Sequence, residues 1–402
     1  MTEILYPKNL HKNQLYNKLL IVLFLALVFG ASITTWGNLD NSVQPEALFD
    51  RQSLLSGELA RDFEEQYDEG FSLQQIGLNV WTAFQYVIFN EAKKGLLIGT
   101  NGWFFSTEEF IAPAGGEQAL KNNIEFIAQA SRQLTRRGVG LMVVLIPSKA
   151  RVVEAQTGSH QPTKIHREMY SQVIKTLQKK HILTVDGFRA MRAHPQPKSL
   201  YLKTDTHWTP QGAKIIASSS AALFYQNLPQ LSLSQQKFNT ETIGEESLEG
   251  DLLRFLPLAP LFEKLMPAAE TIELTQTYSA NNDFLFANEP IEEPELFEDE
   301  LATLPEVVLL GTSFSADRRW NFDGALKQAL AVDVENLAEQ GQGPIMPMAN
   351  FLNDYLPTAD NLKLVIWEIP ERYLPIAYPQ AYSQSSLNMA STSYKNSITE
   401  IK

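Results

Sequence analysis

Two short segments, far apart in the sequence, together contain the side chains of a serine-dependent acyl-transfer site. Residues 204–210 contain Asp205 and His207, and residues 311–315 contain Ser313. A serine hydroxyl is a weak nucleophile at neutral pH, so it needs an imidazole to remove its proton and a carboxylate to fix the imidazole tautomer. The sequence therefore predicts a Ser-His-Asp triad made of Ser313, His207 and Asp205.

The spacing of Asp205 and His207 favours an extended or loop conformation. In an extended segment, side chains two residues apart point to the same side, so the carboxylate can reach Nδ1 while Nε2 faces the serine. Thr209 suits an N-cap and Pro210 suits the first position of a helix. We expect the pair to lie where a loop meets a helix.

Ser313 follows the short apolar run 306–310, which is typical of a strand buried in a parallel sheet. In open α/β sheets, ligands and catalytic groups gather beyond the carboxyl ends of the strands, where free N–H groups can bind an anion. Ser313 is therefore suitably placed for a nucleophile. Considered without His207, it would be interpreted as the cap of the next helix.

Helical and strand patterns alternate along much of the chain. Helices are expected at 120–137, 167–180, 325–330 and 348–355, and strands at 140–146, 182–185, 306–310 and 364–367. This alternation predicts an α/β fold in which a mostly parallel sheet has helices on both faces. The pattern lapses at about 228–304, an expected insertion that includes the block 250–256 and an acidic, proline-broken run at 289–300.

Composition excludes several classes of protein and site. The 402 residues include no cysteine, which excludes disulfides, a cysteine nucleophile and cysteine-based metal sites. The net charge of −13 argues against nucleic acid as a partner, because phosphate binding needs a basic face. The histidines other than His207 form no convincing metal-ligand pattern. We therefore expect neither a metal nor a cofactor.

The N-terminus resembles a membrane anchor. Lys8, Lys12 and Lys18 precede an apolar or small stretch at 19–33, and no further charge occurs before Asp40. This stretch is close to the roughly 20 residues that a bilayer requires. We expect a retained single-pass anchor with its N-terminus inside and the catalytic part outside. A cleaved signal peptide is the alternative, because residues 30–32 are small, and it would export the catalytic part as well.

From about residue 95 to 373 the chain resembles the alginate O-acetyltransferases of the AlgJ and AlgX type, whose catalytic domain is a permuted SGNH-hydrolase fold. The motifs that carry the resemblance lie at 99–105, 146–149, 204–210, 311–315, 320–322 and 367–372. As in that family, the Asp/His pair precedes the serine, whereas in ordinary SGNH hydrolases the serine comes first. The resemblance implies that Asp205, His207 and Ser313 take the catalytic positions.

The same resemblance implies O-acetylation of an exopolysaccharide in the periplasm, by a protein held in the inner membrane. It also implies a membrane-bound acyltransferase as acetyl donor, because acetyl-CoA is cytoplasmic and the sequence has no nucleotide-binding motif. The chain ends soon after Arg372 with a polar tail instead of a carbohydrate-binding module, which favours the AlgJ type. A polysaccharide acetyl esterase and a non-catalytic adaptor of an export complex are the alternatives.

Four residues are candidates for substrate binding: Trp208, Arg318, Asn321 and Arg372. A tryptophan can stack on a sugar ring, although buried packing is its commoner role. Arg318 and Asn321 follow the nucleophile and could hold an oxyanion or the acceptor, while Arg372 ends another expected strand and could orient the site. For the arginines, a surface ion pair is the alternative role.

The expected organisation has five parts. They are a cytoplasmic tail at 1–18, an anchor at 19–37, a periplasmic spacer with the start of the domain at 38–94, an acetyltransferase domain at 95–380 and a polar tail at 381–402. We expect regular folding to begin near Gly95.

Overall fold

In the computed structural model of the chain, the described residues are 74–280 and 305–382, with isolated helical positions at 18–19, 21–22, 24–26, 29–30, 56 and 61. The expected cytoplasmic tail, most of the expected anchor at 19–37, the acidic run 289–300 and the tail from 383 lie outside them. Among the described helices, none combines the length and the apolar character needed to cross a bilayer.

The chain divides into two compact units. The described part of the first contains 74–90 and 257–266, with α4 (Gln74–Phe84), the π-helix η2 (Gln85–Phe89) and the short 3-10 helix η7 (Glu263–Leu265). Within this unit the buried Asn79 donates a hydrogen bond of 2.6 Å to the carbonyl of Pro257. The helix α4 precedes the expected start of regular folding near Gly95, but it belongs to this first unit, and the second unit begins at Glu91 with its first strand at Leu96. Residues 74–89 are helical, and none of them has a charged side chain.

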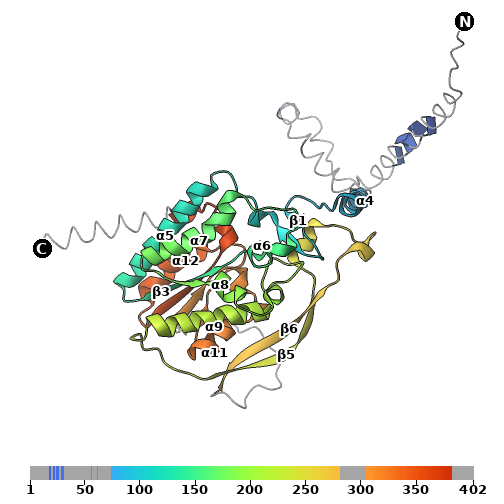
Figure 1. The fold of residues 1–402 in the computed structure, drawn as a ribbon. Helices are drawn as coiled ribbons and strands as arrows, with labels where there is room; N and C mark the ends of the chain where they lie inside the picture. Colours follow the sequence, from blue (N-terminus) through green and yellow to red (C-terminus); the bar gives the residue numbers. More distant parts are fainter. Residues whose placement is uncertain are drawn as a thin grey trace, which may run out of the picture. The chain divides into compact units, whose positions relative to one another are not determined.

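A five-stranded parallel sheet forms the centre of the second unit (Figure 1). Its order is β4-β3-β9-β7-β8, and every neighbouring pair is parallel. The strands are β3 (Gly140–Ile146), β4 (Leu183–Asp186), β7 (Val307–Leu310), β8 (Glu335–Asn336) and β9 (Leu364–Pro370). The predicted parallel sheet is confirmed.

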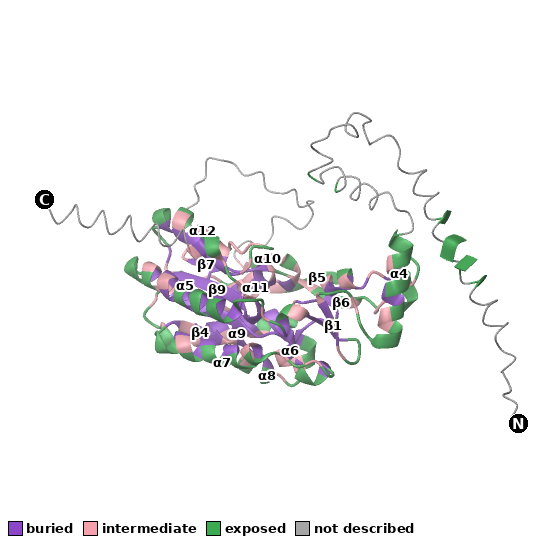
Figure 2. Ribbon diagram, turned by 90° about the horizontal axis from the view of Figure 1, so that it is seen from above, coloured by how far each residue is buried: buried purple, intermediate pink, exposed green. Residues whose placement is uncertain are grey.

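Helices cover both faces of this sheet, as predicted. Along β3, Met142 and Val144 pack into one core with residues of α9 (Pro210–Asn227) and α11 (Phe322–Leu330). The alternate residues Val143 and Leu145 pack on the other face with α5 (Gly116–Arg136), α7 (Lys164–Lys179) and α12 (Ile345–Asn350). Successive side chains of a strand point to opposite faces, so one apolar run serves both cores. Figure 2 shows these buried strands between helices whose outer surfaces are exposed.

Shorter elements connect these layers. They are β1 (Leu96–Ile98), β2 (Phe104–Ser106), α6 (Lys149–Val152), α8 (Gly187–Arg192) and α10 (Ser313–Ala316), with 3-10 or π turns η3 (Thr107–Glu109), η4 (Glu154–Gln156), η5 (Pro197–Leu200), η6 (Asp251–Phe255), η9 (Arg318–Trp320), η10 (Phe351–Tyr355), η11 (Leu356–Thr358) and η12 (Glu371–Tyr373). The strands β1 and β2 pair as an antiparallel hairpin.

The described part of the expected insertion is dominated by a long antiparallel ribbon of β5 (Phe238–Leu248) and β6 (Glu270–Ser279). Most of its side chains are exposed or half-buried, so its sequence lacks the apolar alternation that marks a strand against a core. The ribbon lies beside α9 and α11 at the edge of the second unit (Figure 1).

Candidate active site

His207 lies in a tight loop that leads into α9. An isolated antiparallel bridge joins Tyr201 to Trp208 and closes the loop between them. Thr209 then caps α9 by accepting a hydrogen bond of 3.2 Å from the N–H of Gly212, with Pro210 as the first helical residue. The predicted cap is confirmed, and it places the Asp205 and His207 segment where a loop meets a helix.

Ser313 is the first residue of α10, three residues after β7 ends at Leu310. Gly311 permits this turn, because a Cβ there would lie 2.4 Å from Oε2 of the buried Glu368. Thr312 caps α10 through its hydroxyl, which accepts from the N–H of Phe314 at 3.3 Å. The serine therefore lies just beyond the carboxyl end of an interior strand, as the apolar run 306–310 predicts.

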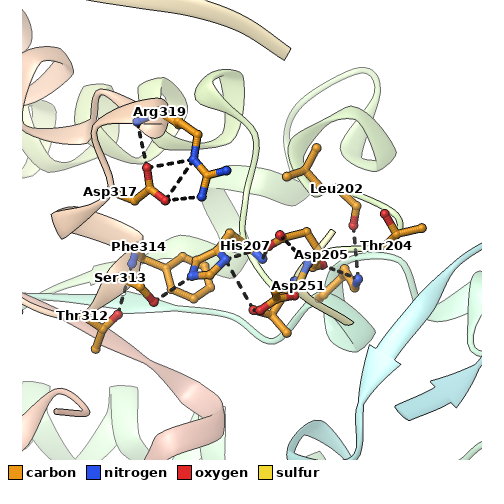
Figure 3. Close-up of polar contacts among 12 residues, drawn as sticks. Leu202, Thr204, Asp205, His207, Asp251, Thr312, Ser313, Phe314, Asp317 and Arg319 are labelled. Carbon is orange, nitrogen blue, oxygen red and sulfur yellow. Dashed lines mark hydrogen bonds and ion pairs between the residues drawn. The ribbon is translucent and has the colours of Figure 1, made fainter. Parts of the chain in front are cut away.

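The three expected side chains meet in one hydrogen-bonded series (Figure 3). Oγ of Ser313 lies 2.7 Å from Nε2 of His207, and Nδ1 of His207 lies 2.6 Å from Oδ1 of Asp205. Because a carboxylate only accepts, Nδ1 carries the imidazole proton and Nε2 is left to accept from the serine hydroxyl. This arrangement can remove the serine proton and return it to a leaving group.

The carboxylate of Asp205 is held on both oxygens. Oδ1 accepts from Nδ1 and from the backbone N–H of His207, at 2.6 and 2.8 Å, and Oδ2 accepts from the backbone N–H of Asp251 at 2.9 Å. Burial raises the pKa of Asp205, but the hydrogen bonds and charge of His207 and the N–H of Asp251 outweigh it and bring the pKa to about 2. Asp205 is therefore ionised at neutral pH.

Asp251 supports the same loop from η6, inside the expected insertion. Its carboxylate accepts from the N–H and the hydroxyl of Thr206, at 2.8 and 2.7 Å. Gly250 allows the two segments to meet, because a Cβ there would lie 2.1 Å from the carbonyl oxygen of Thr204. The sequence alone indicates no role for the block 250–256. Only the adjacent Gly250 and Asp251 hint at a close approach to another segment.

Lys149 is a second group that the sequence did not single out, although it ends the motif 146–149. Its Nζ donates to the carbonyl oxygens of Leu202, Lys203 and Asp205, at 3.1, 3.1 and 2.6 Å. The side chain is 1% exposed, and its ammonium lies 5.8 and 5.3 Å from the rings of Trp103 and Phe105. Burial lowers the pKa of Lys149 to about 8, against the opposing effect of nearby carboxylates. Lys149 therefore fastens the backbone of the Asp205 loop.

Glu368, on β9, accepts hydrogen bonds from the turn that carries Ser313. Its carboxylate accepts from the N–H of Thr312 at 2.8 Å and from the hydroxyls of Thr312 and Ser315 at 3.1 and 3.0 Å. The side chain is fully buried. Burial raises the pKa of Glu368 to about 7, although the hydrogen bonds from the turn and the charge of Arg372 oppose the rise. The residues on both sides of Ser313 are thus tied to one carboxylate.

Within the described part of the chain, Asp205, His207 and Asp251 form the one cluster of acidic and imidazole groups close enough to hold a metal ion, with ligand atoms within 4.8 Å of each other. Their atoms are already engaged. Nδ1 of His207 binds Asp205, Oδ2 of Asp205 accepts from Asp251, and the Asp251 carboxylate accepts from Thr206. The cluster is built as a hydrogen-bond relay.

The four substrate-binding candidates occupy different environments. Trp208 is fully buried, with its ring 5.2 and 4.9 Å from those of Phe314 and Phe322, so the proposal that it contacts a substrate is wrong and its role is packing. Arg318 is exposed at the start of η9. Asn321 is half-buried and donates from Nδ2 to Oγ1 of Thr275 and of Thr277, at 3.1 Å each.

Arg372, the fourth candidate, is buried beside the catalytic loops. Its guanidinium carbon lies 5.3 Å from the centre of the Phe314 ring and 4.8 Å from that of Tyr373. Its terminal nitrogens lie 3.4 Å from the carbonyl and the hydroxyl of Thr206. Arg372 therefore joins the neighbours of His207 and Ser313, as a positioning group, and is 6% exposed.

Trp320 provides one wall of the site. Its ring stacks on the imidazole of His207, with ring centres 5.4 Å apart and planes inclined by 24°. The ring of Phe314 lies 4.8 Å from the same imidazole. These two aromatic contacts restrict the rotation of His207 and shield it from water.

Comparisons with known proteins show the family of the chain. A family model described as an SGNH hydrolase-like domain, acetyltransferase AlgX, matches residues 96–371. The probable alginate O-acetylase AlgJ of Pseudomonas aeruginosa is 39% identical over 324 residues, which cover 81% of this chain and 82% of that protein. The AlgJ of Azotobacter vinelandii is 37% identical and covers 82% of each.

A solved structure has a similar fold. The O-acetyltransferase domain of Pseudomonas putida AlgJ superposes with a TM-score of 0.63 at 33% sequence identity, covering 72% of this chain and 98% of that domain.

Proposed function

Since this chain belongs to the family of SGNH hydrolase-like acetyltransferases of the AlgX type, we propose that it transfers acetyl groups to hydroxyls of alginate or a similar exopolysaccharide through an acetyl-Ser313 intermediate. One observation carries the proposal: the continuous series from Asp205 through His207 to Ser313, with contacts of 2.6 and 2.7 Å. This hydrogen-bonded series supports a nucleophilic role for Ser313 rather than a role in packing.

In the first step, Nε2 of His207 takes the proton of the Ser313 hydroxyl as Oγ attacks the acetyl carbonyl of the donor. The negative charge on the carbonyl oxygen is stabilised by the backbone N–H of Ser313, at the start of α10. The imidazolium, stabilised by ionised Asp205, then gives its proton to the leaving group of the donor. The products are acetyl-Ser313 and the free leaving group.

In the second step, His207 takes a proton from a sugar hydroxyl, whose oxygen attacks the acetyl-serine carbonyl. The bond to Oγ of Ser313 breaks, and the serine recovers its proton from His207. Water in place of the sugar would give hydrolysis, so an acetyl esterase remains the second candidate. The difference depends on acceptor binding and on the exclusion of water from the imidazole.

The proposal also covers the cellular location of the protein and the source of its acetyl group. An anchor at 19–37 holds the chain in the inner membrane, a spacer at 38–94 leads to the periplasmic catalytic domain at 95–380 with its permuted motif order, and a polar tail follows. The immediate acetyl donor is a membrane-bound acyltransferase. Support comes from the apolar N-terminal stretch and from the order of Asp205, His207 and Ser313 along the chain.

The test is acetyl transfer by the full chain purified in detergent, with a chromogenic acetyl ester as donor and oligomannuronate as acceptor. Mass spectrometry follows the oligosaccharide, and the Ser313→Ala variant is the control. Acetylation that depends on Ser313 supports the transferase. Serine-dependent ester hydrolysis without transfer supports the esterase, and equal activity of the variant supports a non-catalytic adaptor.

A further inference from the structure

The ring that covers His207 belongs to a short segment that is tied to the β5–β6 ribbon on both sides of that ring. Trp320 is 1% exposed and stacks on the imidazole with ring centres 5.4 Å apart. It ends η9, which lies between α10 and α11 in the sequence. A single turn of 3-10 helix has few hydrogen bonds of its own, so its position depends on contacts with its neighbours. Those contacts come from Arg319 and Asn321, the residues on either side of the tryptophan.

Asn321 forms the first tether. Its Nδ2 donates to Oγ1 of Thr275 and of Thr277, both on β6, at 3.1 Å each. The two N–H groups of the amide are thereby used within the protein. The backbone of Asn321 is left-handed, with φ +48°, a conformation that asparagine adopts more readily than most residues. Gly324 makes room for the side chain, because a Cβ there would lie 2.0 Å from Oδ1 of Asn321. The segment is therefore built to hold this amide against the ribbon.

Arg319 forms the second tether (Figure 3). Its Nε donates to Oδ1 of Asp317 at 3.0 Å, and the same carboxylate oxygen accepts from the backbone N–H of Arg319 at 3.0 Å. An ion pair of 3.7 Å joins the guanidinium to Glu246 on β5. The guanidinium carbon lies 5.2 Å from the centre of the Trp320 ring, within the range of a cation–π contact. Arg319 thus contacts the ring and the ribbon at once, although partial exposure makes its ion pair the weaker tether.

The position of Trp320 bears on the fate of the acetyl-Ser313 intermediate. A sugar hydroxyl and a water molecule can both attack it, and both need His207 as their general base. The Trp320 ring covers one face of the imidazole, and the His207 side chain is 11% exposed. A ring fixed in this place closes that face to water, whereas a ring free to move would admit it. The tethers therefore control how fast water can consume the intermediate.

We propose that Asn321 and Arg319 are positioning residues that act through Trp320. By fixing the ring on His207, they protect acetyl-Ser313 from water and so favour transfer to a sugar over hydrolysis. The β5–β6 ribbon provides the partners of both tethers and is the support on which this protection depends. The inference rests on the proposed function, because it requires the acetyl-Ser313 intermediate.

The test compares two rate constants of the full chain in the absence of sugar. Acylation is followed by the release of the chromophore from an acetyl ester in the first turnover. Deacylation is followed by mass spectrometry, as the loss of the acetyl group from Ser313 to water after the ester is removed. Both steps use His207, so a disturbed base slows both, whereas easier access of water raises the ratio of deacylation to acylation. This ratio separates the protection from water from a general loss of structure.

The variants break the same contact from both sides. Trp320→Leu removes the ring itself. Asn321→Gly removes the amide and keeps a residue that adopts the left-handed backbone without strain. The double variant Thr275→Val with Thr277→Val removes the acceptors from the ribbon and leaves η9 unchanged. The matched control is Thr271→Val, at an exposed threonine of the same strand β6.

We expect the ratio to rise about tenfold in Trp320→Leu, in Asn321→Gly and in the double valine variant, the effect of losing two neutral hydrogen bonds or the ring that they hold. Arg319→Met, which keeps the apolar stem, should raise it about twofold. Combining Asn321→Gly with the two valines should add nothing, because both changes break the same hydrogen bonds. A ratio unchanged in Trp320→Leu, or raised there but unchanged in the Asn321 and valine variants, would overturn the inference.

Failure of the proposed function is visible separately in the wild-type chain. Absence of any acetyl-Ser313 would refute the proposed function and this inference with it. An acetyl-Ser313 that passes to water but never to oligomannuronate, with a ratio that depends on Asn321, would refute transfer to that sugar while supporting the protection of the intermediate by Trp320.

Discussion

The backbone N–H of Asp251 donates a hydrogen bond of 2.9 Å to Oδ2 of Asp205, the oxygen that His207 leaves free. This contact joins η6, within the insertion, to the loop that carries His207, the proposed general base. It satisfies the second oxygen of a buried carboxylate, which keeps that carboxylate ionised and oriented toward the imidazole. The insertion therefore contributes a backbone hydrogen bond to the candidate catalytic site.

Asp251→Ala should lower kcat/KM for a chromogenic acetyl ester about tenfold, since it leaves the buried N–H and hydroxyl of Thr206 without their partner, at a cost of about 1 to 3 kcal/mol. The effect should lie mainly in kcat, because Thr206 is positioned between Asp205 and His207. Asp354→Ala, at an exposed acidic residue of η10, is the control. Wild-type kinetics in Asp251→Ala would show that the loop holds its shape without this carboxylate.

Glu368→Gln should change how stability depends on pH. Burial raises the pKa of Glu368 from 4.5 to about 7, so protonated Glu368 is favoured in the folded state. Its stabilising contribution is fully present below pH 4.5 and is lost as the pH rises through about 7. Glutamine does not titrate. The free energy of unfolding of wild type, relative to the variant, should therefore fall by roughly 3 kcal/mol or less over that range.

Urea unfolding of the two proteins at pH values from 4 to 8 measures this difference. The contributions of the other titrating groups cancel because both proteins share those groups. Ester hydrolysis provides a second readout, since an amide replaces one acceptor of the Thr312 and Ser315 hydrogen bonds. Parallel stability profiles for the two proteins would contradict the role assigned to Glu368.

Lys149→Met should destabilise the catalytic unit by about 2 to 4 kcal/mol, because the carbonyl oxygens of Leu202, Lys203 and Asp205 lose their buried donor. Methionine retains most of the packing against Trp103 and Phe105, so the loss reports the hydrogen bonds and the charge of the ammonium. The midpoint of thermal unfolding, compared with that of Lys175→Met at an exposed lysine of α7, measures it. An unchanged midpoint would mean that water satisfies these carbonyls equally well.

Local sequence signals predicted the elements whose structure depends on nearby residues. The run 140–146 coincides with β3 because a strand buried on both faces is apolar at every position. Thr209 and Pro210 predicted the start of α9 because capping is decided within one turn. Residue type and order along the chain predicted that Asp205, His207 and Ser313 lie together, and their side chains are within hydrogen-bonding distance.

Features created by tertiary contact were not predicted. Asp251 and Lys149 approach the site from segments remote in sequence, and nothing adjacent to them indicates their partners. The burial of Trp208 between Phe314 and Phe322 likewise depends on packing across α9, α10 and α11. The β5–β6 ribbon was missed because its two faces are both largely polar.

The most direct test of the account is mass spectrometry of the peptide that contains Ser313, after the full chain reacts briefly with a chromogenic acetyl ester and is quenched in acid. We predict one acetyl group on Ser313, absent from His207→Ala, that disappears when oligomannuronate is added as the same acetyl group appears on the sugar. Acetylation of the oligosaccharide with no acetyl-Ser313 at any time, or at an equal rate in Ser313→Ala, would contradict the central claim.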